Sequence, residues 1–320
     1  MDAWFFEAKG YDYKELKNFD FVSNDEIRSF VYDVRSYGKL FLIGSKGSGK
    51  TLLLHKKAYE YFNKKRKESD EPKATRLSDD IVEVLDFPGL DIPESSLLEL
   101  KDHYRWKDIW TFSVGLITLR KAGIELPESS RIKCAELEPF TELRFIVTYI
   151  LNDYERFKRE GLFRLNTLIM NFINKLNDRY VLFIDGLDQA LNPLLKSPEY
   201  EFIRENDPEV LYRVWQAAQF GLLLALHSLP SSHNRRLLVF ATARKEALAI
   251  DDQMSINVSG FCIDLEYSVD QLEKIFIKNI ERTPKRHLYK TPTGKKESIY
   301  QFFGCNDMNH PASVEKNGQQ

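Results

Sequence analysis

The sequence predicts an α/β fold in which helices cover both faces of a mainly parallel sheet. Short, almost continuously apolar segments alternate with longer segments of helical periodicity along most of the 320 residues. Strands without polar alternation are typical of sheets that are buried on both faces, and such sheets are usually parallel. Glycine-rich or polar residues directly follow three of these apolar segments. Ligands of such folds bind beyond the carboxyl ends of the strands, so we expect the functional site there.

The first predicted strand and helix stand near the N-terminus. A lead-in segment, residues 1–38, includes a short helix expected over residues 24–37. Residues 39–43 form an apolar run that breaks at Gly44 and is typical of a buried strand. Residues 50–67 are predicted to be helical, because apolar side chains recur every four residues and basic residues collect at the C-terminal end, where they suit the helix dipole.

The middle of the chain is predicted to be mostly helical. Residues 81–85 are a candidate second strand. Residues 95–123 and 141–177 have helical character, and Gly161 indicates one break in the second range.

The remaining elements complete a predicted core of residues 39–267. Two apolar strands are expected over residues 180–184 and 236–241, with a helix between them over residues 208–229. A weaker strand follows over residues 260–265. Asp185 directly follows the first of these strands, and Thr242 the second. A last helix over residues 268–282 begins with Ser268, which fits a capping box with Gln271. Beyond it the chain is polar and is expected to be disordered or truncated.

Composition and charge indicate a soluble protein of one large domain, or of one domain with a smaller appendage. The chain is 43% hydrophobic and has a formal net charge of −2, so no strong field favours nucleic acid or an acidic membrane. Three distant cysteines, Cys134, Cys262 and Cys305, match neither a metal site nor a disulfide framework, as in a reducing cytosol. Neither a signal peptide nor a membrane span is recognisable. We therefore expect a cytoplasmic protein without membrane contact.

The strongest motif is a glycine-rich loop between the first strand and its helix. Its residues are Gly44, Ser45, Lys46, Gly47, Ser48, Gly49, Lys50 and Thr51, which match G-x-x-x-x-G-K-[ST] in full. The glycines let consecutive N–H groups point into one concavity, and the helix adds the positive end of its dipole. We expect this loop to bind nucleotide phosphates. Lys50 would reach the β- and γ-phosphates, and Thr51 would place its hydroxyl on Mg²⁺.

Two acidic residues follow the strand over residues 180–184. A carboxylate such as Asp185 is costly to bury at a strand end without a partner, and Mg²⁺ would supply that partner. Asp188 lies just beyond, where it would orient or deprotonate an attacking water. The alternative for Asp188 is a purely structural role as the cap of the following turn.

Together, the loop of residues 44–51 and the segment Phe183-Ile-Asp-Gly-Leu-Asp-Gln189 resemble P-loop ATPases of the AAA+/STAND class, including NACHT domains. The resemblance covers roughly residues 35–280. It implies a three-layer P-loop NTPase fold, ATP and Mg²⁺ as cofactors, and residues 268–320 as the start of a helical lid. Gln189 stands where many relatives have Glu, which would make hydrolysis slow.

The same resemblance implies sensors of the γ-phosphate at the end of the strand over residues 236–241. Thr242 is the first candidate. Arg244 would contact the γ-phosphate in cis, or reach a neighbouring subunit as an arginine finger. The alternative is a helix-capping threonine and a surface arginine.

The resemblance also suggests a biological role. Such chains are often regulators or act in antiphage defence, usually as homo-oligomers with an effector domain or partner protein. A non-enzymatic variant of this hypothesis uses ATP as a latch for oligomerisation, with little turnover.

Three other functions remain alternatives. Asp86-Phe-Pro-Gly89 matches the D-x-x-G of a GTPase, but no strand is followed by N-K-x-D. A small-molecule kinase would need an arginine-rich lid, and no compact cluster of that kind is recognisable. A DNA-directed ATPase would need a basic face or a further domain, which the charge balance does not indicate.

Overall fold

The computed structural model describes residues 24–33, 38–67, 81–86, 89–125, 142–229 and 236–282. Glu26–Leu265 forms one compact unit, and helix α14 (Val269–Arg282) belongs to a second unit. The capping box predicted for this helix is confirmed. The Ser268 amide donates to Gln271 Oε1 (2.9 Å), and the Gln271 amide donates to Ser268 Oγ (3.3 Å). The polar tail, predicted to be disordered or truncated, lies outside the described residues.

Five parallel strands form one sheet in the order β2-β3-β4-β1-β5, which confirms the predicted α/β class and parallel sheet. The strands are β1 (Phe41–Gly44), β2 (Ile81–Asp86), β3 (Tyr180–Asp185), β4 (Leu237–Arg244) and β5 (Cys262–Asp264). All residues of β1 and β3 are buried, as their continuous apolar character predicts. Strand β4 lies between them and joins the two strands that lead to the predicted site.

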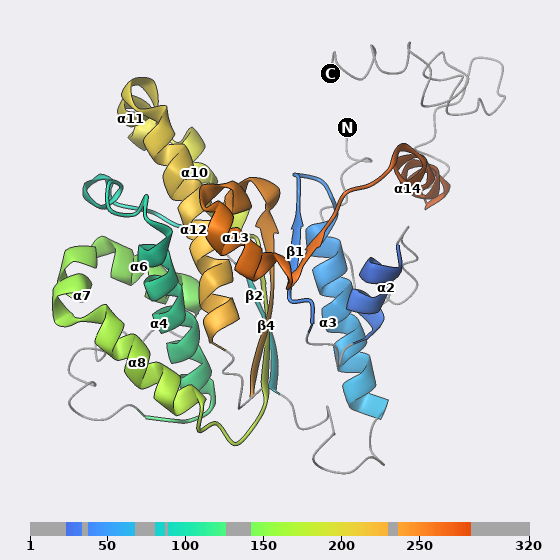
Figure 1. The fold of residues 1–320 in the computed structure, drawn as a ribbon, viewed down its shortest axis with the longest axis horizontal. Coiled ribbons are helices and arrows are strands. Elements are labelled where there is room, and N and C mark those ends of the chain that lie inside the picture. Colours follow the sequence, from blue (N-terminus) through green and yellow to red (C-terminus); the bar gives the residue numbers. More distant parts are fainter. Residues whose placement is uncertain are drawn as a thin grey trace. The chain divides into compact units, whose positions relative to one another are not determined.

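Helices cover both faces of this sheet (Figure 1). Helix α3 (Lys50–Lys67) packs on one face, against β1, β3 and β4, and α12 (Pro208–Ser228) packs against β4 on the other. The predicted bounds of α3 are confirmed. Helix α4 (His103–Lys121) lies on α12, and α6 (Leu143–Asn152) and α8 (Leu162–Ile173) lie on α4. This face therefore carries a deeper stack of helices than a three-layer fold requires.

Several predicted helix boundaries need correction. The range 95–123 becomes helical only at His103, because Asp102 caps α4 by accepting the Tyr104 amide (2.9 Å). The break at Gly161 is confirmed, with φ of +87°. A second break at Asp153 separates α6 from α7 (Tyr154–Glu160), so the range 141–177 holds three helices.

Short helices that the sequence did not reveal flank β3 and β4. They are α9 (Leu187–Ala190), α10 (Asn192–Lys196), the 3-10 helix η6 (Pro198–Tyr200) and α11 (Glu201–Asn206) after β3, and the 3-10 helix η7 (Lys245–Ile250) and α13 (Asp252–Ser259) after β4. A 3-10 turn, η4 (Glu94–Ser96), precedes α4. Within the described ranges, no helix combines the length and apolarity that a bilayer crossing requires.

A tight contact joins α4 to α12. Trp106 and Trp110 stack with ring centroids 5.9 Å apart, and both side chains are fully buried. The Trp110 indole donates to Ala218 O (2.9 Å). At Gly221 the helices are so close that a Cβ atom would lie 2.5 Å from Trp106 Cβ. The absence of a side chain at Gly221 is what allows this approach.

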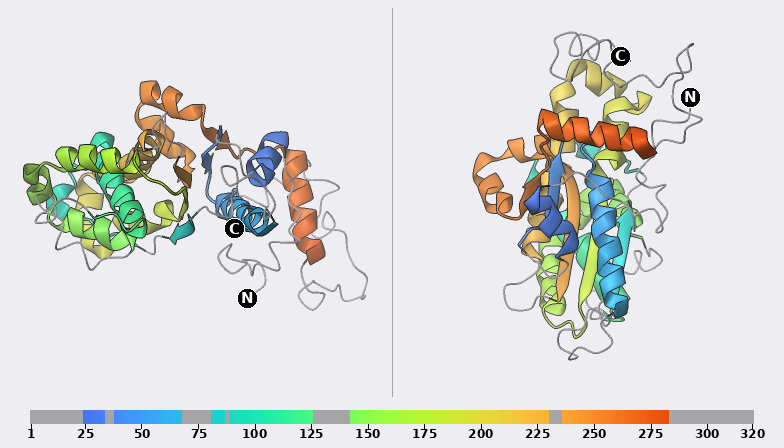
Figure 2. Two further views of the ribbon diagram at one scale, coloured as in Figure 1. Left: turned by 90° about the horizontal axis from the view of Figure 1, so that it is seen from below. Right: turned by 90° about the vertical axis from the view of Figure 1, so that its right-hand side faces the viewer.

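A buried lysine anchors helix α2 (Asp25–Tyr32) to α3, beside which it lies in the right-hand view of Figure 2. Lys57 of α3 is fully buried, and its Nζ donates to Phe30 O (2.5 Å). The ammonium lies 4.4 Å from the ring centroids of both Phe30 and Phe240, a cation–π arrangement. Burial lowers the pKa of Lys57 to about 7, although Asp33 acts in the opposite direction.

Candidate functional site

The loop of residues 44–51 connects β1 to the N-terminus of α3. Gly47 and Gly49 have φ of +84° and +85°, a conformation that glycine adopts without steric cost. The Leu53 amide donates to Gly49 O (3.0 Å), and the amides before it belong to the first turn, which has no acceptors inside the helix. The loop therefore ends at a helix N-terminus of the kind that binds anions.

Lys50 is folded back onto this loop. Its side chain is buried, and Nζ donates to Gly44 O (2.9 Å) and Ser45 O (2.8 Å). Burial lowers the pKa of Lys50, whereas the carboxylates of Asp188 and Asp185 act to raise it. The ammonium is thus within electrostatic range of both predicted acidic residues.

Asp185 ends β3 and is almost fully buried, with 3% of its surface exposed. Its Oδ1 accepts a hydrogen bond from the Thr242 hydroxyl (2.5 Å). Its Oδ2 finds no hydrogen-bond partner among the described residues, and His55 Nε2 lies 4.0 Å away. One oxygen of a buried carboxylate is therefore available to a ligand.

The position of Thr242 corrects the predicted strand boundary. Strand β4 does not end before Thr242 but continues to Arg244. Thr242 is buried inside the strand, and its hydroxyl is used by Asp185. The residue at the strand end is Arg244, because pairing with β1 extends β4 as far as the level of Gly44.

Asp188 and Arg244 form an ion pair at the edge of the site. Asp188 lies in the first turn of α9, and its Oδ2 is 3.0 Å from Arg244 Nε. Both side chains are mostly buried, with 19% and 15% of their surface exposed. Because Arg244 is the register partner of Gly44, the ion pair lies beside the start of the loop.

Other predicted residues lie toward solvent. Ser45, Lys46 and Gly47 are exposed at the loop tip, and Gln189 is exposed on α9. An open hollow of about 520 Å³ adjoins the loop; it is lined by Ser45, Lys245, Glu246, Leu248 and Ala249. Its volume is within the range of small-molecule pockets.

The residues present suit Mg²⁺ better than a metal that needs a cage of side chains. The described part of the chain contains no group of three or more His, Cys, Asp or Glu residues arranged to hold a metal ion. Mg²⁺ commonly uses one or two carboxylates and takes its other ligands from water and substrate phosphates. The available Oδ2 of Asp185 fits this requirement. Thr51, one turn before His55 on α3, supplies a hydroxyl on the same side of that helix.

Sequence reasoning missed the contribution of α12. Gln219 is fully buried, and its Oε1 accepts the backbone amide of Arg244 (3.0 Å). Gln216 Nε2 donates to Glu246 O (2.8 Å). The signal was visible in the sequence, because two glutamines three residues apart interrupt the otherwise apolar residues 214–226.

Comparisons with protein families, with curated proteins and with solved structures found no match for this chain.

Proposed function

We propose that this chain is a P-loop ATPase of the AAA+/STAND class, which binds ATP with Mg²⁺ at residues 44–51 and hydrolyses it slowly. The observation that carries the proposal is the loop itself. Two glycines at positive φ lead into the N-terminus of α3, and Lys50 and the available oxygen of Asp185 lie at its side. This combination suits a polyphosphate with a bound cation.

Each side chain of the site has a separate role in this proposal. The loop amides and the α3 dipole bind the phosphates, and Lys50 exchanges its two loop carbonyls for phosphate oxygens. Asp185 and Thr51 hold Mg²⁺, which when bound neutralises charge on the β- and γ-phosphates. Thr242 keeps the Asp185 carboxylate in place through Oδ1.

Asp188 is the residue best suited to orient a water and accept its proton. In the structure this carboxylate is paired with Arg244, with Oδ2 3.0 Å from Nε. The γ-phosphate would compete for Arg244 and release Asp188. Gln189 is exposed and carries no carboxylate, so it does not assist, and slow turnover is expected.

The ion pair between Asp188 and Arg244 also favours a second candidate, a latch that binds ATP with little turnover. In that case assembly follows nucleotide occupancy. Homo-oligomerisation, an effector protein partner and a role in regulation or antiphage defence rest on the sequence resemblance alone, and we propose them on that basis.

The first test is nucleotide binding by the purified chain and by Lys50→Ala. ATP and GTP are both measured, and we expect ATP to bind. Binding of ATP should weaken by more than about tenfold in the variant, because the phosphates lose a charge-assisted hydrogen bond of about 1.5–3 kcal/mol. Lys121→Ala is the control, because Lys121 is an exposed lysine in the last turn of α4. Normal affinity in Lys50→Ala would contradict the assignment of the loop.

The second test separates the ATPase from the latch. Asp188→Asn should retain ATP binding and lose steady-state turnover, because an amide cannot accept the proton from water. Light scattering with and without ATP measures the mass in the same samples. Tight binding with negligible turnover in the unmodified chain, together with a nucleotide-dependent change in mass, would favour the latch.

A further inference from the structure

Helix α12 holds the end of β4 through side-chain amides. Gln219 has no exposed surface, and its Oε1 accepts the Arg244 amide at 3.0 Å. Its Nε2 donates to Trp215 O (3.3 Å), so both ends of the buried amide are satisfied. A buried amide without partners is destabilising, and these two contacts remove that penalty.

The same helix contacts the chain on both sides of the ion pair. Trp215 Nε1 lies 3.5 Å from Asp188 O, on the α9 side. On the β4 side, Gln216 binds Glu246 O, and Arg213 donates to Ile250 O at 3.4 Å. One buried helix therefore supports both residues of the Asp188–Arg244 pair.

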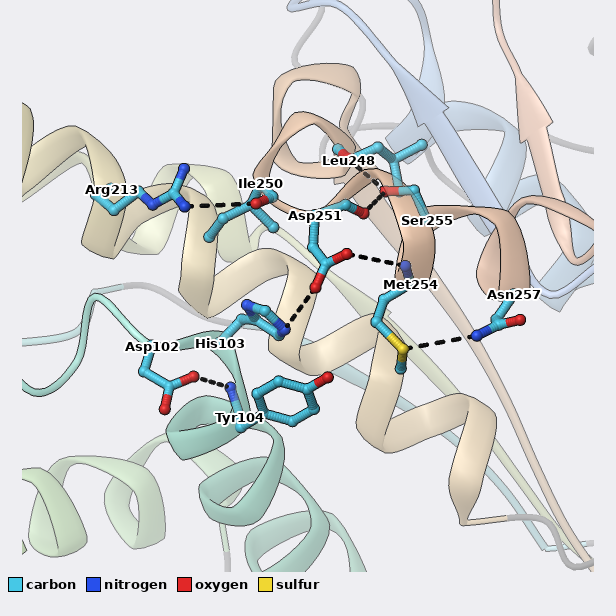
Figure 3. A network of polar contacts seen from close by, with 10 residues as sticks. All are labelled: Asp102, His103, Tyr104, Arg213, Leu248, Ile250, Asp251, Met254, Ser255 and Asn257. Carbon is cyan, nitrogen blue, oxygen red and sulfur yellow. Dashed lines mark hydrogen bonds and ion pairs between the residues drawn. The ribbon is translucent and has the colours of Figure 1, made fainter.

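A second network fixes the segment that follows Arg244 (Figure 3). Asp251 caps α13 by accepting the Met254 amide at 3.0 Å, and its other oxygen lies 3.6 Å from His103 Nε2 on α4. Arg213 reaches Ile250 in the same view. The chain beyond Arg244 is thus held by contacts that do not involve Gln219, whereas the Gln219 side chain contacts the backbone of Arg244 itself.

We propose that Gln219 is a positioning residue for Arg244, and that this contact sets how well the site distinguishes a nucleoside triphosphate from a diphosphate. This inference rests on the proposed function. The Arg244 side chain is long and flexible, and it has two acceptors to choose from: Asp188 and the γ-phosphate. Fixing its backbone at the strand end limits the positions of the guanidinium to those that reach these acceptors. A displacement of about 1 Å in such a group can cost up to about a hundredfold in a binding or catalytic step.

The experiment compares two matched variants, Gln219→Met and Gln216→Met. Each removes one buried side-chain amide from the same helix and keeps a side chain of similar length, but only the first removes the contact with Arg244. For each variant, the dissociation constants of ADP and of a non-hydrolysable ATP analogue are measured with Mg²⁺, together with the Tm.

We expect both variants to lower the Tm, and only Gln219→Met to change nucleotide preference. Its preference for the triphosphate should fall by about three- to tenfold, the factor that corresponds to one net hydrogen bond, with ADP affinity within about twofold of the unmodified chain. Arg244→Ala should lose the same preference, and the double variant should lose no more than Arg244→Ala. Gln219→Glu keeps the accepting oxygen, so it should retain most of the preference.

Two results would overturn the inference. The first is an unchanged triphosphate preference in Gln219→Met. The second is an equal loss in Gln216→Met, which would mean general loosening of the helix. If Gln219→Met does not fold, a loss of preference in Gln219→Glu as large as that in Arg244→Ala decides against the inference. Failure of the unmodified chain to bind either nucleotide would instead reject the proposed function, and this inference with it.

Discussion

Replacing Asp185 with asparagine should make the protein more stable than the unmodified chain when no ligand is bound, and less stable when Mg²⁺ and ATP are bound. The carboxylate is 3% exposed, Thr242 satisfies Oδ1, and Oδ2 has no hydrogen-bond partner among the described residues. The asparagine side chain would keep the shape and still accept from Thr242, but it would carry no charge. We therefore expect Asp185→Asn to be more stable than the unmodified chain when no metal is present.

The structure sets the size of this effect. A buried polar group without a partner costs about 1–3 kcal/mol. Lys50 is within electrostatic range and offsets part of the cost of the charge, and the new amide Nδ2 would lack a partner in its turn. The expected gain is therefore about 1 kcal/mol. With ligand at one hundred times its Kd, the unmodified chain gains about 2.7 kcal/mol, whereas a variant that has lost its metal ligand gains much less.

The assay is urea denaturation with a chelator, and again with Mg²⁺ and ATP. The variant should unfold at higher urea in the first condition and at lower urea in the second. Asp264→Asn serves as the control, because that carboxylate is 44% exposed in a surface pair with Lys245 and should change stability by no more than about 0.5 kcal/mol. A variant that is less stable than the unmodified chain in chelator would refute the idea that the buried Asp185 charge destabilises the metal-free protein. Equal stabilisation by Mg²⁺ and ATP would show that Asp185 is not a metal ligand.

Two further predictions concern packing and pH. Gly221→Ala should lower the free energy of unfolding by about 1–3 kcal/mol in urea denaturation, since its Cβ would lie 2.5 Å from Trp106 Cβ and 2.7 Å from a backbone oxygen. Gly260→Ala is the control, where a Cβ meets nothing within 4 Å, and an equal loss there would contradict the steric explanation. Lys57 has a folded pKa of about 7 against an ordinary 10.5, so between these values the unfolded chain binds more protons and stability should rise with pH. The free energy of unfolding should rise by at most about 1.4 kcal/mol per pH unit, and Lys57→Met should remove this rise. Urea titrations at pH 7 and 9 measure it. An equal rise in the variant would assign the pH dependence to other groups.

Features that depend on local sequence were predictable. The bounds of α3 follow from its periodicity and its basic C-terminal end. The burial of Asp185 was expected, because this residue directly follows a continuous apolar strand. The break at Gly161 was visible because glycine favours a positive φ there, whereas the break at Asp153 carries no glycine or proline and was missed.

Features that depend on contacts between distant segments were not predictable. Thr242 was expected at a strand tip, but β4 is extended to Arg244 by its pairing with β1. The pairing of Arg244 with Asp188 joins residues from two different strand ends. The hydrogen bond between Gln219 and Arg244 could not be predicted, because the partner of Gln219 is a backbone amide 25 residues away in the sequence. Periodicity reports which face of a helix is buried, but it does not report what that face touches.

The two hydrogen bonds from Lys50 to the loop carbonyls have a consequence for which anions can enter. The Lys50 ammonium already donates to two loop carbonyls, so an incoming anion must replace these two acceptors before its own contact with Lys50 contributes to binding. A lone phosphate or sulfate replaces them with little net gain. A polyphosphate chain would contact several loop amides as well as the ammonium, and these additional contacts would outweigh the loss of the two carbonyl acceptors. If the proposed function is correct, these internal bonds would favour a polyphosphate over single small anions.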